Sequence, residues 1–130
     1  MAILLKYLVS KGHKGKMIKT VGVSEIIDIV SKKLGIETIT TPVGFKWLSE
    51  KMRENETILA GEDSGGLSIG RHIPEKDGIF ANLLILEAVC ALKKPLCELK
   101  KEIINFSGKE FFQDRVDVKL KSNDEKAALL

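Results

Sequence analysis

The stretch Thr57-Ile58-Leu59-Ala60-Gly61-Glu62-Asp63-Ser64-Gly65-Gly66-Leu67-Ser68-Ile69 does most to decide the fold. Residues 57–60 predict a buried strand that runs directly into a glycine-rich loop, and residues 67–69 leave that loop in extended form. We therefore expect the loop to join two adjacent antiparallel strands. Glycine lets the backbone approach a ligand closely, while a carboxylate and a hydroxyl supply hydrogen-bonding groups. Two interpretations stay open at this point: a loop that grips a polyol, and an ordinary surface turn that carries one acid.

The residues before this stretch alternate between helical and strand patterns. We expect helices at 3–10, at 24–34 with Ser24 as N-cap and Gly35 as terminator, and at 41–52 opened by Thr41-Pro42, with strands at 17–21 and 36–40 between them. After the loop, Asp77 is placed to cap a helix over 78–92 that is apolar nearly all round and is therefore predicted to be buried on several sides. This β-α-β-α-β order predicts an α/β fold with a mixed, mainly parallel sheet and helices on both faces.

The pattern changes after Pro95. Residues 96–103 suggest a short amphipathic connector, 106–113 a loop, 116–120 one alternating strand and 123–130 the first turns of a helix. A strand and the start of a helix cannot bury a core of their own. The sequence therefore predicts one domain followed by the beginning of another.

Composition limits the classes of function. The 130 residues have a formal net charge of +3 and only seven aromatic side chains, which favours neither nucleic-acid binding nor a base-stacking platform. No apolar run reaches the about 18 residues that a membrane-spanning helix requires. Cys90 and Cys97 lack metal-ligand spacing and are expected to be core thiols of a reducing compartment. These features predict a cytoplasmic protein without a nucleic-acid or membrane partner.

Asp63-Ser64-Gly65-Gly66 matches the sequence around the nucleophile of trypsin-like proteases. That fold is all-β, whereas this chain has helical periodicity over much of its length and offers only His13 and His72 as bases. The Gly-x-Ser-x-Gly pattern of other hydrolases is also missing, because Glu62 stands two residues before the serine. We therefore expect no nucleophilic catalysis by Ser64.

Two segments, 41–46 and 61–66, fall at the carboxyl ends of predicted parallel strands, where ligands bind in open α/β sheets. Together with Leu67-Ser68-Ile69 and Asp77-Gly78-Ile79, they resemble the third domain of the α-D-phosphohexomutases, the phosphoglucomutase and phosphomannomutase family. The resemblance implies a three-layer α/β/α sandwich. It also implies that residues 1–98 are domain III and that 99–130 are a linker and the truncated start of domain IV.

The resemblance also implies which residues bind substrate. Glu62 and Ser64 match the loop positions that bind the sugar hydroxyls, between the loop glycines Gly61 and Gly65. Lys46, in Gly44-Phe45-Lys46, matches a lysine that lies near the substrate, although a solvated lysine in the first turn of a helix is the alternative. Gly66 stands where many phosphoglucosamine mutases carry histidine, which favours a glucose or mannose phosphate.

Much of the family's machinery is missing from the sequence. The phosphoserine loop, the Mg²⁺-binding Asp-x-Asp-x-Asp-Arg and the phosphate-binding loop belong to other domains, so the chain is expected to be inactive alone. The resemblance implies Mg²⁺, a glucose 1,6-bisphosphate-type activator, a hexose phosphate substrate and the other domains of the same polypeptide as partners. The alternative is a stand-alone, non-catalytic module that binds a sugar phosphate or a protein.

Overall fold

A computed structural model describes residues 1–112 and 114, so the strand and helix expected at 116–120 and 123–130 lie outside the described residues. The elements in chain order are α1 (Ala2–Ser10), β1 (Lys16–Thr20), α2 (Ile26–Lys33), β2 (Thr38–Thr41), α3 (Phe45–Glu54), β3 (Thr57–Gly61), β4 (Leu67–Ser68), α4 (Gly78–Leu92) and α5 (Leu96–Ser107). The sheet has the order β2-β1-β3-β4. β1 pairs in parallel with β2 and β3, and β4 pairs antiparallel with β3. The predicted mixed, mainly parallel sheet is confirmed.

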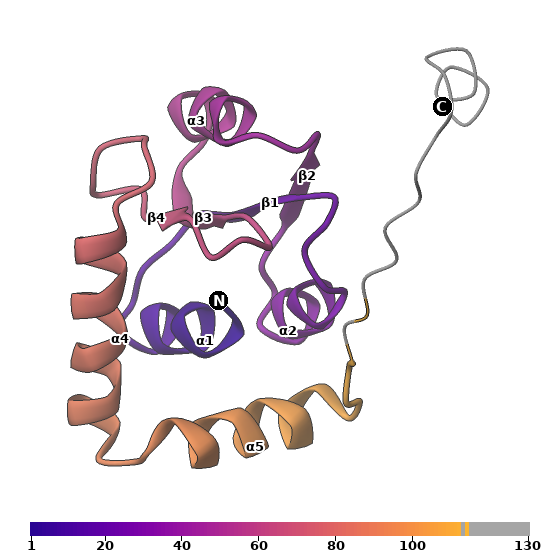
Figure 1. The fold of residues 1–130 in the computed structure, drawn as a ribbon, viewed down its shortest axis with the longest axis vertical. Coiled ribbons are helices and arrows are strands. Elements are labelled where there is room, and N and C mark those ends of the chain that lie inside the picture. The colour runs from indigo at the N-terminus through magenta and orange to yellow at the C-terminus, as the bar shows by residue number, and fades with distance from the viewer. Residues whose placement is uncertain (113, 115–130) are drawn as a thin grey trace.

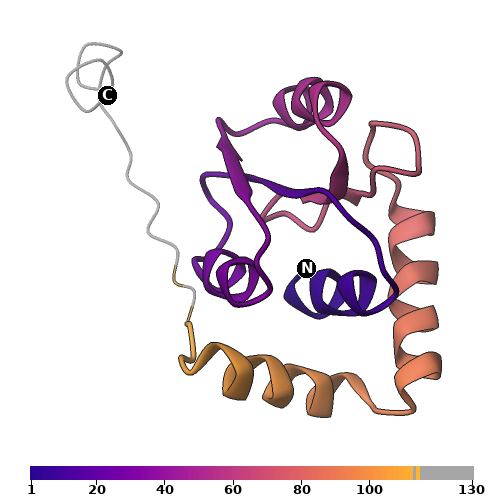
Figure 2. The same ribbon diagram turned by 180° about the vertical axis from the view of Figure 1, so that it is seen from behind.

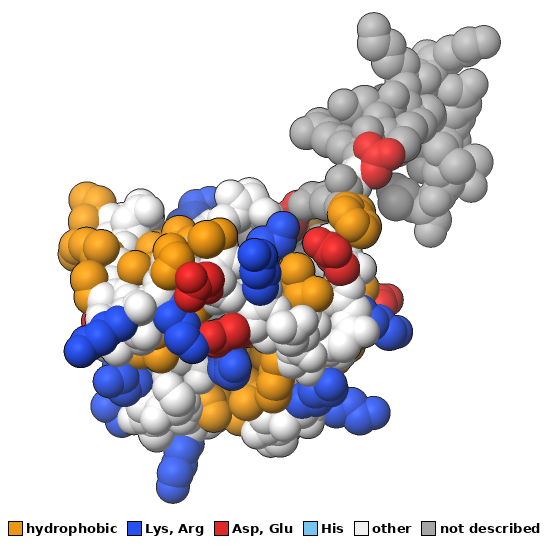
Figure 3. Space-filling view, turned by 90° about the horizontal axis from the view of Figure 1, so that it is seen from below, with side chains coloured by type: hydrophobic (Ala, Val, Ile, Leu, Met, Phe, Trp, Pro, Cys, Tyr) orange, Lys and Arg blue, Asp and Glu red, His pale blue; other side chains and the backbone are white. Residues whose placement is uncertain are grey.

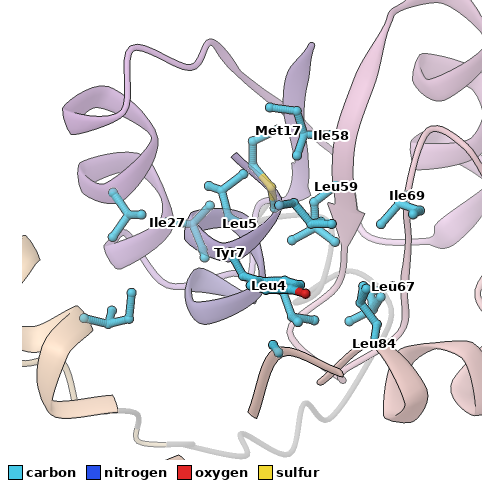
Figure 4. Close-up of a cluster of buried hydrophobic side chains, with 14 of the residues drawn as sticks. Leu4, Leu5, Tyr7, Met17, Ile27, Ile58, Leu59, Leu67, Ile69 and Leu84 are labelled. Carbon is cyan, nitrogen blue, oxygen red and sulfur yellow. The ribbon is translucent and has the colours of Figure 1, made fainter. Parts of the chain in front are cut away.

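The sheet separates two hydrophobic clusters, because successive side chains of a strand point to opposite faces. Met17 faces the larger cluster, which α1 and α2 cover and to which α4 and α5 contribute (Figures 1 and 4). Ile18 faces a smaller cluster under α3, with Phe45, Leu48 and Ala60. Figure 2 shows the same layers from behind, with α3 on one side of the sheet and α1 and α2 on the other. The expected α/β/α layering is confirmed.

Two predicted helix starts were displaced. Thr41 does not open α3: it ends β2, where its carbonyl accepts a hydrogen bond from the Val21 N–H at 3.0 Å. The chain turns instead at Gly44, which has a φ of 123°, and α3 begins at Phe45. Ser24 precedes the N-cap of α2, Glu25, by one residue, and its hydroxyl accepts only a long bond of 3.4 Å from the Ile26 N–H.

The cap of α4 was predicted correctly and its burial was not. Asp77 Oδ1 accepts a hydrogen bond from the Phe80 N–H at 2.9 Å, as expected of an N-cap. However, only Leu84 and Ala88 of this helix are buried. α4 stands at the edge of the domain and packs along one face only (Figures 1 and 2).

α5 is longer than the predicted connector and belongs to the same core. Leu99 and Ile103 are buried, and the Lys33 ammonium donates to the Phe106 carbonyl at 2.7 Å, which ties the last turns of α5 to α2. The expected boundary between residues 98 and 99 therefore falls inside a helix. Cys90 and Cys97 are free thiols, but both are exposed, so their expected place in the core was wrong.

Candidate functional site

Residues 62–66 form a narrow turn between β3 and β4. The Glu62 N–H donates to the Gly66 carbonyl at 2.8 Å and the Gly65 N–H donates to the Glu62 carbonyl at 3.2 Å. Gly65 has a φ of 94°, which a residue with a side chain rarely adopts. The turn leaves Asp63, Ser64 and Gly65 exposed, while Glu62 is buried with 7% of its surface accessible.

The Glu62 carboxylate lies over Gly66. A Cβ at Gly66 would stand 3.2 Å from Glu62 Oε2, so the missing side chain leaves room for the acid. The one partner of this carboxylate in the described part of the chain is Lys76, whose Nζ is 4.0 Å from Oε2. Buried carboxylates are normally well supplied with hydrogen-bond donors. The described residues thus leave acceptor capacity of the Glu62 carboxylate unused.

Lys76 was not among the predicted site residues. It reaches Glu62 because the segment 70–77 crosses back from the start of β3 to the loop. Gly70 makes this course possible, since a Cβ there would overlap the Thr57 carbonyl and lie 3.0 Å from its carbon. The Asp77 N–H then donates to the Leu67 carbonyl at 3.3 Å. No local pattern predicts this return, and only the glycine at 70 signals a close approach of two backbones.

The 44–46 segment lies at the same edge of the sheet as the loop, because β2 and β3 flank β1 in parallel. Phe45 is buried in the cluster under α3, so its side chain packs in the core. Lys46 is exposed, with its Nζ 4.6 Å from the centre of the Trp47 ring. The structure therefore brings the predicted residues to one edge but leaves Lys46 out of contact with Glu62.

A second lysine at this edge is structural. Lys19, paired with Gly61 in the sheet, is buried, and its Nζ lies 2.7 Å from Asp28 Oδ2 and donates to the Val23 carbonyl at 3.2 Å. These contacts hold the turn between β1 and α2.

Asp63 lies against this turn, beside Gly22, and lines a cleft of about 680 Å³ with residues 22–27, 1–2, 111–112 and 114. Glu62 does not line that cleft. The two neighbouring acids of the loop therefore face different parts of the molecule: Asp63 faces the cleft, and Glu62 lies beside Lys76.

The described residues do not support a hydrolase or a metal centre. Ser64 makes no hydrogen bond to either histidine, and His72 Nε2 lies 3.1 Å from Asp77 Oδ2 with its ring stacked on Phe80. Within residues 1–112 and 114, no group of three or more His, Cys, Asp or Glu side chains is placed to hold a metal ion. In the same part of the chain, no helix is long and apolar enough to cross a membrane.

Comparisons with known proteins show the family and the fold of the chain. The family model "Phosphoglucomutase/phosphomannomutase, alpha/beta/alpha domain III" matches residues 1–106. The phosphoglucosamine mutase of Methanocaldococcus jannaschii is 35% identical over 107 residues, which are 82% of this chain and 24% of that protein. A crystal structure of a Thermus thermophilus protein described as a phosphomannomutase is 40% identical with a TM-score of 0.80, over 82% of this chain and 24% of that one. The crystal structure of parafusin (phosphoglucomutase) from Paramecium is 27% identical with a TM-score of 0.66, over 83% of this chain and 20% of that one. The chain thus spans about a quarter of the length of these relatives.

Proposed function

Because the chain belongs to the phosphoglucomutase/phosphomannomutase family, as its α/β/α domain III, we propose that it is the sugar-recognition domain of an enzyme that interconverts hexose 1-phosphate and hexose 6-phosphate. The buried Glu62 carboxylate carries the proposal. It sits in a glycine-rich turn with one cation 4.0 Å away and no hydrogen-bond donor from the described residues. Two neighbouring sugar hydroxyls would supply the donors that such a group needs.

The other residues of the edge have supporting roles. Ser64, exposed beside Glu62, would donate to or accept from a third hydroxyl, and Gly61 and Gly65 keep the turn free of side chains. Lys76 on one side of the loop and Lys46, at the start of α3 next to Gly44 and Phe45, supply positive charge for a phosphate. A loop that binds hydroxyl groups between the two ends of a sugar can bind the substrate in both orientations. A substrate that reorients within the site requires this.

Phosphoryl transfer needs groups that the described residues do not supply. The reaction needs a nucleophile, and a Mg²⁺ ion and further cations to stabilise the transferring phosphoryl group. We propose that other domains of a cytoplasmic enzyme supply the nucleophile and bind Mg²⁺, and that the enzyme uses a glucose 1,6-bisphosphate-type activator. The chain alone should therefore show no turnover of glucose 1-phosphate with Mg²⁺ and the bisphosphate. A stand-alone module that binds a sugar phosphate or a protein is the alternative, and a coding sequence bounded by start and stop signals at this chain would favour it.

The test compares Glu62→Gln with Asp63→Asn, which removes the adjacent charge on the cleft side of the same loop. In the polypeptide that carries all the domains, Glu62→Gln should lower kcat/KM at least about tenfold, which corresponds to about 1.4 kcal/mol of lost transition-state binding. Asp63→Asn should change it less than about threefold. Assays with glucose, mannose and glucosamine phosphates separate the substrate classes, of which Gly66 favours the first two. Equal losses for the two variants, or a loss explained by a lower Tm, would contradict the role of Glu62.

A further inference from the structure

A small hollow lies at the amino ends of β1 and β3, at the opposite edge of the sheet from the loop 62–66. It has a volume of about 220 Å³ and is lined by the loop between α1 and β1, the segment that joins α3 to β3, and the residues that follow β4. We call it the amino-edge pocket. Because β3 runs from Thr57 to Gly61, about 13 Å of strand separates this pocket from the loop 62–66. The pocket is therefore distinct from the site proposed above.

Two glycines let the chain segments meet at the amino-edge pocket. At Gly15, which has a φ of 119°, a Cβ would overlap the Glu56 carbonyl oxygen and stand 2.9 Å from the Thr57 nitrogen. At Gly70, a Cβ would overlap the Thr57 carbonyl oxygen. The Lys16 N–H donates to the Glu56 carbonyl at 2.8 Å, which fixes the first of these approaches. The loop before β1 and the segment after β4 thus lie against the start of β3 from its two sides, since β1 and β4 flank β3 in the sheet.

These segments bring basic side chains to the pocket. His13 and Lys14 line it from the loop before β1, and Arg71 lines it from the segment after β4. None of these three side chains has a hydrogen bond or an ion pair with another of the described residues. Glu56 is the one acid among the described residues that line the pocket, and its carboxylate is likewise without an ion pair. Lys14 and Arg71 therefore outweigh the negative charge of Glu56.

Basic side chains elsewhere on the surface are arranged differently. On the face that carries α5, Lys and Arg side chains lie scattered among acidic and hydrophobic ones (Figure 3). Lys94 pairs there with Glu102, and on α3 Lys51 pairs with Glu54. At the amino-edge pocket, unpaired basic side chains from two separate loops converge on a hollow. Convergent polar groups around a concave surface are typical of a binding site.

We propose that the amino-edge pocket binds a phosphate group, either as the free ion or as the end of a small phosphorylated compound. The guanidinium of Arg71 presents N–H donors in a fork that matches two oxygens of a phosphate, and Lys14 and His13 add single donors. The volume of about 220 Å³ is smaller than the about 300–1,000 Å³ of sites for larger organic ligands. It suits one phosphate group better than a nucleotide. This binding goes beyond sugar recognition and uses no residue of the loop 62–66.

Titration of this chain with sodium phosphate at constant ionic strength, followed by amide NMR, tests the proposal. The amide signals of residues 12–15 and 70–71 should shift and reach saturation. Arg71→Gln should raise the Kd for phosphate at least about tenfold, and Lys14→Gln about threefold, because each removes a charged hydrogen-bond donor. Arg53→Gln is the matched control: it changes an exposed arginine of α3 outside the pocket and should alter the Kd less than about twofold. Glu62→Gln should leave these shifts unchanged.

A second titration, with glycerol 3-phosphate, distinguishes the two forms of the ligand. Tighter binding than that of inorganic phosphate supports a phosphorylated compound, and weaker binding supports the free ion. Shifts that grow without saturation, or that are equal in Arg71→Gln and Arg53→Gln, would show only the screening of surface charges and would overturn the proposal. Shifts confined to residues 46, 62–66 and 76 would also overturn it, because they would place the anion at the sugar loop.

Discussion

Gly70→Ala is the sharpest test of how the site is assembled. A methyl group at this position would overlap the Thr57 carbonyl and lie 3.0 Å from its carbon and 3.3 Å from its Cα. The obstacle is the backbone of the central strand β3 and cannot rotate away. Overpacking costs about 1–3 kcal/mol, and we expect the upper end of that range. For a domain of this size, about 3 kcal/mol lowers the Tm by about 10 °C.

The substitution should also disturb the loop 62–66, because the segment 70–77 positions Lys76 beside Glu62. Thermal and urea unfolding followed by circular dichroism measure the loss of stability. Gly78→Ala is the control: a Cβ there meets nothing within 4 Å at the first position of α4, and the change should stabilise the domain by about 0.5 kcal/mol. An unfolding free energy for Gly70→Ala within about 0.5 kcal/mol of the parent would refute the close approach as the reason for this glycine.

Two further predictions concern the domain boundary and pH. Truncation after residue 98 removes the buried Leu99 and Ile103, so the free energy of unfolding of this product should be about 4 kcal/mol lower than that of the product truncated after residue 108. Urea unfolding measures the difference, and equal stabilities would support the boundary expected at 98. The pKa of Asp77 is lowered, first by the Phe80 N–H bond and then by His72, below its ordinary 3.8. The stabilisation is therefore complete above that value and is lost as the pH falls through the lower folded-state pKa. Asp77→Ala should lower the Tm at pH 7 by several degrees, and the gap to the parent should narrow towards pH 3; a gap unchanged by pH would contradict it.

Sequence periodicity was sufficient for the layers and the mainly parallel sheet of this fold, because the alternating helices and strands up to β3 leave few ways to bury their apolar faces. It did not predict the strand order β2-β1-β3-β4. The hairpin around the loop followed from Thr57 to Ile69 alone, since a short glycine-rich connection between two apolar runs favours antiparallel neighbours. The cap at Asp77 was equally local. Each of these features depends on residues close together in the sequence.

The errors came from contacts that local patterns do not contain. Thr41 and Pro42 have the chemistry of a helix start, but the hydrogen bond from the Val21 N–H keeps Thr41 in the sheet, and the chain turns at Gly44 instead. Lys76 reaches Glu62 only because Gly70 lets a loop cross the start of β3.

Leu99 and Ile103 were assigned to a connector because nothing in their sequence shows that α1 and α2 leave a face for them. The apolar composition of α4 predicted a helix buried on several sides, and this was wrong for the described chain, in which only Leu84 and Ala88 of the helix are buried.

Glu62 is buried with 7% of its surface accessible, and its carboxylate accepts no hydrogen bond from the described residues, so a ligand could supply the donors. A sugar that donates to Glu62 would complete the hydrogen bonding of this carboxylate, and the comparison of Glu62→Gln with Asp63→Asn tests this.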